Sequence, residues 1–174
     1  MTTQMGKRTK LVNDPSDLVP LLRTFGSSTH KSVFDELSEG WMTEQELTER
    51  IGVDVKPSLV ILRKSGLIES QWRMPEPGKT PDKEYTVSYS KLHANFQCSI
   101  KDMSDLIMIT FKSDGELADM IESIEEEVFK GNRSMAGLSR VFDLSATFIR
   151  SIARRSDKLV VKGQRLELAK TGDQ

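Results

Sequence analysis

The sequence predicts a mainly α-helical protein with small β-hairpin wings, arranged as two similar units in tandem. Apolar residues recur at helical spacing through most of the chain, and Ser, Thr or Asp stands where several of these stretches begin. Short alternating stretches that contain or adjoin Pro or Gly follow each group of helices and predict hairpins. Shifting the sequence by 91 residues also aligns one half with the other, which indicates two related units.

The N-terminal part is predicted to hold a basic arm and then a first domain. Residues 1–13 are polar and lack periodicity, so we interpret them as a flexible arm. A domain over 14–90 follows, and Asp14 can cap its first helix. Apolar stripes predict helices over 18–25 and 28–38.

The segment after these helices is the most diagnostic part of the chain. Thr43 and Glu46 have the spacing of a capping box, which marks a helix start, and Gly52 ends that helix. Another short helix is expected from Pro57 to Gly66. Two short helices joined by a Gly-containing turn are the helix-turn-helix arrangement.

A β-hairpin is predicted directly after this pair of helices. The apolar period changes toward two over 68–74 and 84–89, and Pro75, Pro77 and Gly78 interrupt the chain between these strands. A hairpin that follows a helix-turn-helix makes a winged helix-turn-helix. The first domain is therefore predicted to have this fold.

The second half is predicted to repeat the same order of elements. Residues 91–112 are interpreted as a connector, and 113–174 as a second winged-helix-like domain. Ser113, Ser134 and Ser145 can each cap a helix there. A final alternating stretch predicts a short hairpin.

The internal repeat matches core positions, a helix stop and a helix cap, which are the positions that folding constrains most. The alternative is that any two helical stretches match at a few apolar positions, but a hairpin after each third helix favours a true repeat. The aligned pairs include Val33 with Ile124, Leu37 with Val128, Gly40 with Gly131, Thr43 with Ser134, Leu47 with Leu138 and Ile61 with Ile152.

A resemblance to known regulators supports the first domain. The stretch Leu59–Ile68 closely resembles the end of the recognition helix and the first wing strand of ArsR-like and MarR-like winged helix-turn-helix regulators. The resemblance extends from about Asp17 to Tyr89 and has the character of archaeal transcriptional regulators. It implies DNA binding and transcription regulation. The paired cysteines of the metal-sensing members are missing here, so metal sensing is not implied.

The net charge of −1 hides opposed blocks of charge. Residues 102–127 contain nine acidic residues and one lysine, a net charge of −8, whereas 128–174 carry ten bases and four acids, a net charge of +6. A nearly neutral total therefore does not exclude a nucleic-acid partner.

Other classes of function find little support in the sequence. No apolar run approaches the roughly 20 residues that a membrane-spanning helix needs, and no secretory signal is evident, so a cytoplasmic protein is expected. The single cysteine, Cys98, is expected to be buried or, alternatively, redox-sensitive. His30 and His93 lack catalytic motifs, so we expect no enzyme activity, no cofactor and no metal.

Two groups of polar residues are candidate DNA contacts. In the first domain they lie on the expected recognition helix and the wing, although each alone could be an ordinary solvated charge. The first group is Lys56, Ser58, Arg63, Lys64, Arg73, Lys79 and Lys83.

The second group is expected to form a continuous exposed polar face and its extension into the final hairpin. Because it is rich in arginine, it is predicted to be the stronger electrostatic site. The alternative is that its arginines pair with the acidic helix over 114–127. This group is Thr147, Arg150, Ser151, Arg154, Arg155, Lys158, Lys162 and Arg165.

The sequence thus predicts a transcriptional regulator that binds double-stranded DNA as a homodimer, because two-fold proteins match palindromic sites. Apolar surface around Leu18, Leu22 and Phe25, or on the helix over 114–130, is expected to form the dimer contact. The alternative is a winged-helix module that docks on a transcription-related protein complex without reading DNA.

Overall fold

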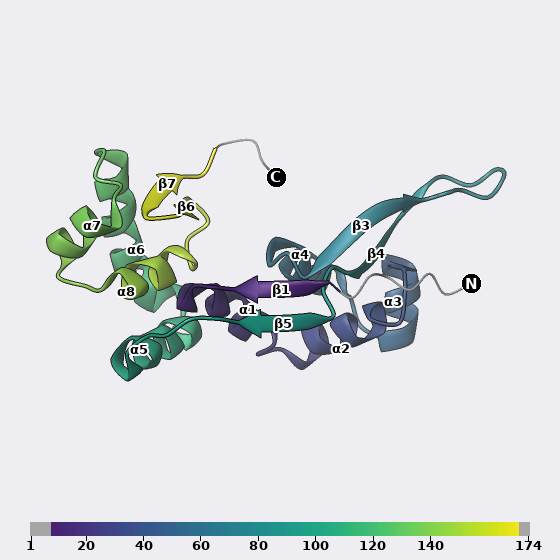
Figure 1. Ribbon diagram of the computed structural model, residues 1–174. Helices are drawn as coiled ribbons and strands as arrows, with labels where there is room; N and C mark the ends of the chain where they lie inside the picture. Colours follow the sequence, from purple (N-terminus) through teal and green to yellow (C-terminus); the bar gives the residue numbers. More distant parts are fainter. Residues whose placement is uncertain (1–7, 171–174) are drawn as a thin grey trace. The chain divides into compact units, whose positions relative to one another are not determined.

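A computed structural model describes residues 8–170 of the chain. Within them the chain forms two compact units: unit 1 comprises 8–11 and 23–94, and unit 2 comprises 12–22 and 95–170. Both are mainly helical and carry small β-sheets (Figure 1). The predicted class, mainly α with small β-hairpins, is confirmed. Among the described residues, no helix is long and apolar enough to cross a membrane.

Unit 1 consists of a helical core with a three-stranded antiparallel sheet, in the strand order β2-β4-β3. Figure 1 shows two of these strands, β3 and β4. This arrangement is consistent with a winged helix, in which β3 and β4 form the wing. The elements are α2 (Ser28–Leu37), β2 (Met42–Thr43), α3 (Glu44–Ile51), α4 (Lys56–Lys64), β3 (Ile68–Arg73), β4 (Asp82–Val87) and β5 (Lys91–Ala94).

The local structure of α3 follows from its ends. The Thr43 hydroxyl accepts a hydrogen bond from the Glu46 amide, and the Glu46 carboxylate accepts one from the Thr43 amide, so the predicted capping box is present. Gly52 ends the helix with a φ of 82°, a conformation that glycine adopts without strain. Inside the unit, Leu37 and Leu47 are fully buried.

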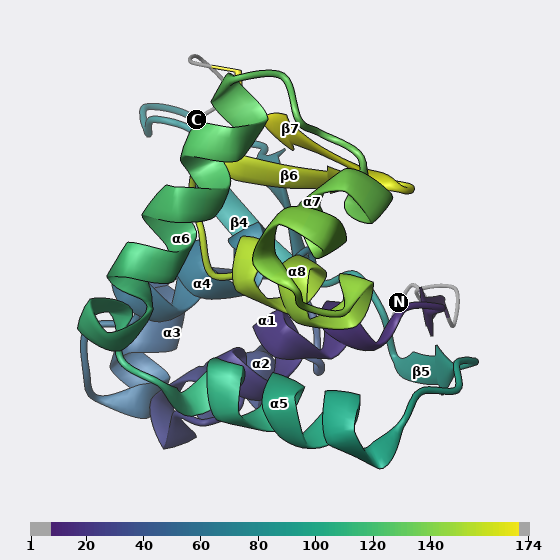
Figure 2. The same ribbon diagram turned by 90° about the vertical axis from the view of Figure 1, so that its left-hand side faces the viewer.

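Unit 2 holds four complete α-helices and a two-stranded hairpin (Figure 2). The helix α1 (Leu18–Thr24) begins in residues of unit 2 and ends in residues of unit 1. The remaining elements of unit 2 are η1 (Pro15–Asp17), α5 (Ile100–Phe111), α6 (Asp114–Phe129), α7 (Met135–Phe142), α8 (Ala146–Ala153), β6 (Leu159–Lys162) and β7 (Arg165–Leu168).

The core of unit 2 joins α6, α7, α8 and the hairpin. Ile124, Leu138, Ile149 and Leu166, one from each of these elements, are fully buried together. The bounds of α7 lie 91 residues after those of α3, and β6 begins 91 residues after β3. Asp143 ends α7 in the left-handed conformation, as Gly52 ends α3.

Several predicted boundaries differ from the structure. Strand β1 (Thr9–Val12) pairs with β5, so residues 9–12 are not an unstructured arm; residues 1–7 of that arm lie outside the described part. The expected connector over 91–112 contains β5 and α5. Residues 12–22 group with unit 2 because Val12, Pro15 and Val19 are buried and η1 packs on α8 and α5.

Candidate nucleic-acid interface

Helix α4 of unit 1 presents one exposed side. Leu59 and Leu62 point into the core, whereas Val60 is 61% exposed. Lys56 precedes Val60 by four residues and Arg63 follows it by three, so these three side chains lie along the same side of the helix. Lys64 is also exposed at the C-terminal end. The exposed side therefore has an apolar centre and a cation at each end.

Ser58, expected on this exposed side, is instead 1% exposed. Its hydroxyl lies 2.7 Å from Nδ1 of His30, which comes from the first turn of α2. Ser58 stands one residue before Leu59 and four before Leu62, which places it on the buried side of the helix. Its hydroxyl is used inside unit 1 and does not face a groove.

Arg73, at the end of β3, is also engaged within unit 1. Its guanidinium donates to Oε1 and Oε2 of Glu46 at 2.8 and 3.0 Å and to Oε2 of Glu84 at 2.6 Å. The Arg73 guanidinium lowers the pKa of the Glu46 carboxyl to about 2, and the two carboxylates raise the pKa of Arg73. Arg73 therefore fixes the wing to α3, which differs from its expected role at phosphates.

The outer part of the wing carries exposed side chains. The Lys83 ammonium lies 5.3 Å from the centre of the exposed Trp72 ring, a cation–π distance. Lys79 forms an exposed ion pair with Glu76 at 2.7 Å. Figure 1 shows β3 and β4 extending beyond the helices of unit 1. The wing thus holds two predicted cations, Lys79 and Lys83.

In unit 2, the face of α8 that carries Arg150 and Ser151 is internal rather than exposed. Ser151 is fully buried, and the Arg150 side chain is 11% exposed. Arg150 donates to Oδ2 of Asp14 at 3.0 Å and to Oε1 of Gln164 at 2.7 Å. Arg154 pairs with Oδ1 of Asp17. The η1 segment packs against this side of α8.

The Arg155 side chain is the most buried of these three arginines. Its side chain is 1% exposed, and Nη1 donates to the carbonyl oxygens of Ile109 and Lys112 at the end of α5. Nη2 donates to Oδ1 of Asp114 at 2.8 Å, at the start of α6. Carbonyls at a helix end lack partners within the helix, so Arg155 satisfies groups that burial would otherwise leave unpaired. Figure 2 shows α8 among α5, α6 and α7.

One known protein family matches most of the chain. A family model described as ArsR transcriptional regulator matches residues 12–170, which is most of the chain. The chain belongs to the ArsR family of transcriptional regulators. Membership assigns it, at the level of the family, to regulators that bind DNA. The predicted resemblance to ArsR-like regulators is confirmed.

Solved structures and curated proteins add less to this assignment. One solved structure that matches is reduced HlyU from Vibrio cholerae N16961, at 20% identity and a TM-score of 0.36. The match covers 43% of this ArsR-family chain and 76% of HlyU. A search of curated proteins finds no match.

In this ArsR-family chain, the arginines of the second predicted group of DNA contacts on α8 and directly after it bind partners within unit 2. The prediction of an exposed polar face on α8 is wrong at Arg150, Ser151 and Arg155, because the packing of η1 and α5 covers these residues. The alternative pairing with the acidic helix is present for Arg155, whose partner Asp114 begins α6.

The remaining members of this group lie at the surface or near it. The Thr147 carbonyl accepts from the Ser151 hydroxyl at 2.7 Å. Lys158 and Lys162 are exposed and form ion pairs with the half-buried Glu125 and Glu167, and Arg165 is exposed on β7.

Sequence reasoning missed the partners of these arginines. Asp14 is predicted to cap a helix and does accept a hydrogen bond from the Ser16 amide, and Asp17 ends the short η1 segment that follows. Each also pairs with an arginine more than 130 residues later in the chain. A single sequence carries no signal for such a distant pair.

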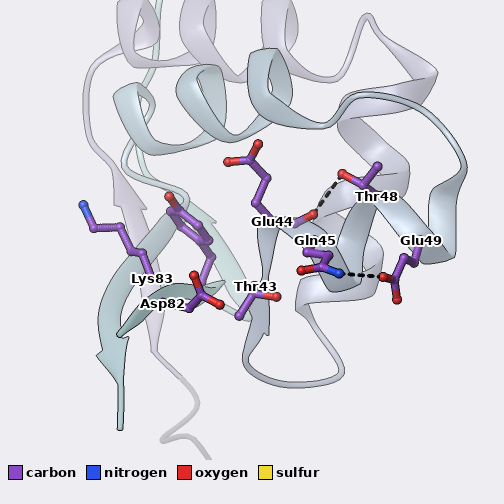
Figure 3. Close-up of a pocket in the computed structure, with 8 residues that line it drawn as sticks. Thr43, Glu44, Gln45, Thr48, Glu49, Asp82 and Lys83 are labelled. Carbon is purple, nitrogen blue, oxygen red and sulfur yellow. Dashed lines mark hydrogen bonds between the residues drawn. The ribbon is translucent and has the colours of Figure 1, made fainter. Parts of the chain in front are cut away.

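A shallow pocket lies on unit 1 between α3 and β4 (Figure 3). Its volume is about 430 Å³, and three carboxylates against one ammonium make it unfavourable for a phosphate. Burial, and next the Glu44 carboxylate, raise the pKa of Tyr85. The lining residues are Thr43, Glu44, Gln45, Thr48, Glu49, Asp82, Lys83 and Tyr85.

The described residues contain no group of three His, Cys, Asp or Glu side chains that could hold a metal ion. Cys98 is half-buried just before α5. Neither of these two observations adds a second candidate site.

Proposed function

We propose that this ArsR-family regulator binds double-stranded DNA through unit 1, with α4 in the major groove and the β3–β4 wing beside the phosphates. The observation that carries the proposal is the contrast between two helices. The exposed side of α4 has cations at both ends, whereas Arg150 and Arg155 of α8 are held by internal partners. A helix contacts base edges only through side chains that reach outward.

The expected phosphate contacts are four exposed cations of unit 1 and the half-buried Lys83. Lys56 stands at the N-terminal end of α4, and Arg63 and Lys64 stand at its C-terminal end. Lys79 and Lys83 lie on the wing, where the sheet holds them apart from α4. Because binding to phosphates releases counterions, affinity through these residues falls steeply with salt concentration.

Unit 2 is proposed to be a second winged helix that serves assembly rather than DNA contact. The matching bounds of α3 and α7, and of the starts of β3 and β6, support a tandem repeat. In the repeat, α8 takes the place of α4. The packing of η1 and α5 on α8 leaves that helix unavailable to a groove.

Helix α5 carries the surface that best fits a homodimer contact. Ile100, Ile107, Met108 and Phe111 are exposed large apolar side chains, and Ser104 lies between them on the same side. These residues are proposed in place of the helix over 114–130, one of the two dimer surfaces expected from sequence, because Leu117, Ile124 and Val128 of α6 are buried.

Four positions of this stripe, Ile100, Ser104, Ile107 and Phe111, are symmetric about the middle of α5. In an antiparallel pair related by a two-fold axis, Ile100 would face Phe111 of the second copy, and Ser104 would face Ile107. A two-fold interface requires a surface that complements itself in this way. A dimer would present two copies of unit 1 to a two-fold DNA site.

The test of the proposal is equilibrium binding to the DNA upstream of the regulator's own gene. Salt-sensitive binding that is weakened by substitution of Arg63 and Lys64 supports it. Binding that does not respond to salt or to these substitutions overturns it.

The second candidate function is docking on a transcription-related protein complex. The exposed Val60 at the centre of α4 favours it, because apolar surface of this kind is common in protein interfaces. Recovery of a stable protein partner, together with DNA affinity no stronger than nonspecific, would select this function.

A further inference from the structure

The exposed side of α4 is unusually poor in groups that read bases by hydrogen bonds. The helix has the sequence KPSLVILRK and contains no Asn, Gln, Asp or Glu. Its one hydroxyl belongs to Ser58, which is buried against His30. Asn and Gln recognise adenine, and Asp and Glu recognise cytosine, so these modes of recognition are missing from α4.

What α4 does offer at its centre is a methyl-rich surface. Val60 and Ile61 are 61% and 37% exposed, and they are adjacent residues on the outer side of the helix. Pro57 precedes Val60 by three residues and Lys64 follows it by four, so the apolar centre lies among the exposed residues of α4.

One base offers a matching apolar group in the major groove. The C5-methyl of thymine projects there, and aliphatic side chains contact it. We infer that unit 1 selects its DNA sites through contact of Val60 and Ile61 with thymine methyl groups, while Lys56, Arg63 and Lys64 hold the phosphates or a flanking guanine. This inference rests on the proposed function and specifies the class of sequence that the same surface prefers.

The flanking charges favour DNA over a protein as the occupant of this surface. Lys56 stands at one end of the apolar centre, and Arg63 and Lys64 at the other. The nine residues of α4 thus carry three cations and no acid. Phosphates line both sides of the major groove, so cations at both ends of an apolar centre match its charge distribution.

The experiment begins with selection of bound sequences from a pool of random DNA duplexes by the full-length protein. In the enriched duplex, each thymine is then replaced in turn by uracil, which removes only the C5-methyl group. Loss of one buried methyl is expected to weaken binding by roughly three- to four-fold at each contacted position. Replacement of non-contacted thymines leaves affinity unchanged.

The Val60→Ala variant identifies the side chain responsible. Because Val60 is exposed, this variant is expected to keep the circular dichroism spectrum and thermal midpoint of the parent. At the position that Val60 contacts, its discrimination between the thymine and uracil duplexes should be smaller than that of the parent. Pro57→Ala, at an exposed neighbouring position of the same helix, is the matched control and should keep the discrimination between thymine and uracil.

The outcomes separate this inference from the proposed function. If binding is salt-sensitive and depends on Arg63 and Lys64, but no thymine-to-uracil replacement changes affinity, the methyl contact is overturned and DNA binding by unit 1 stands. If no sequence is enriched and binding does not depend on Arg63 or Lys64, both are overturned, and an apolar protein partner becomes the occupant of α4.

Discussion

Arg73 and Glu46 form a bidentate ion pair that joins the wing of unit 1 to the first turn of α3. Nη1 lies 2.8 Å from Oε1, and Nη2 lies 3.0 Å from Oε2. The same Glu46 carboxylate completes the capping box of α3 with Thr43. The start of α3 and the base of the wing are therefore held by one carboxylate, which orients the wing relative to the helix-turn-helix.

The first prediction concerns this ion pair. Arg73→Ala should lower the free energy of unfolding by about 1 kcal/mol or more. The pair with Glu46 is roughly two-fifths exposed and solvent weakens it, whereas the buried Glu84 carboxylate also loses a donor. Chemical denaturation at neutral pH measures this change. Arg73→Lys, which keeps the charge but loses the paired geometry, should recover part of it. An unchanged unfolding midpoint in the Ala variant would contradict the assigned role.

A pH dependence follows from the same contact. The folded pKa of Glu46, about 2, lies below its ordinary value of 4.5. The stabilisation is therefore complete above pH 4.5 and is lost as the pH falls from 4.5 toward 2. Unfolding experiments across this window should show a smaller loss of stability in Arg73→Ala than in the parent. Parallel pH profiles in the two proteins would show that Arg73 is not the cause.

Arg155 gives a prediction about unit 2. Its side chain is almost fully buried and supplies donors to three carbonyls and one carboxylate. Arg155→Ala should therefore lower the free energy of unfolding by about 3 kcal/mol or more, since it leaves buried acceptors without partners. Lys158→Ala, three residues later and exposed, is the matched control and should change stability by about 0.5 kcal/mol or less. Equal effects of the two substitutions would contradict the assignment.

Assembly through α5 gives a prediction about mass in solution. Met108→Asp places a charge in the exposed apolar stripe and should convert a dimer to a monomer. Val141→Asp, at an exposed apolar position of α7, is the control and should leave the dimer intact. Light scattering after size-exclusion chromatography distinguishes the two masses. A parent protein that is monomeric at micromolar concentration would overturn the dimer.

Local features of the fold could be predicted from sequence because neighbouring residues determine them. The capping boxes at Thr43 and Ser113 each lie within four consecutive residues, and both are present. The burial of Ser58 could also be predicted from the sequence. With Val55, Leu59 and Leu62 it forms a stripe at helical spacing, and all four residues are buried.

The polar face of α8 could not be predicted correctly for a different reason. Its residues have the spacing of an exposed face, but acids from the η1 segment lie against it. Asp14 and Arg150 are 136 residues apart, and no local pattern links residues so distant. A helix with arginines on one side is equally compatible with solvent, with phosphate or with buried carboxylates, and tertiary packing decides among them.

Removal of the same charge from each unit distinguishes unit 1 from unit 2 as the DNA-binding surface. The Arg63→Ala, Lys64→Ala protein and the Lys158→Ala, Lys162→Ala protein each lose two exposed cations. Binding to the upstream duplex is measured by fluorescence anisotropy at several salt concentrations. If unit 1 holds the DNA, the unit 1 variant binds at least roughly ten-fold more weakly. Its plot of log binding constant against log salt concentration has a slope smaller in magnitude by about 2, while the affinity of the unit 2 variant stays near that of the parent. Weakened binding in the unit 2 variant, with parental binding in the unit 1 variant, would contradict DNA binding through unit 1.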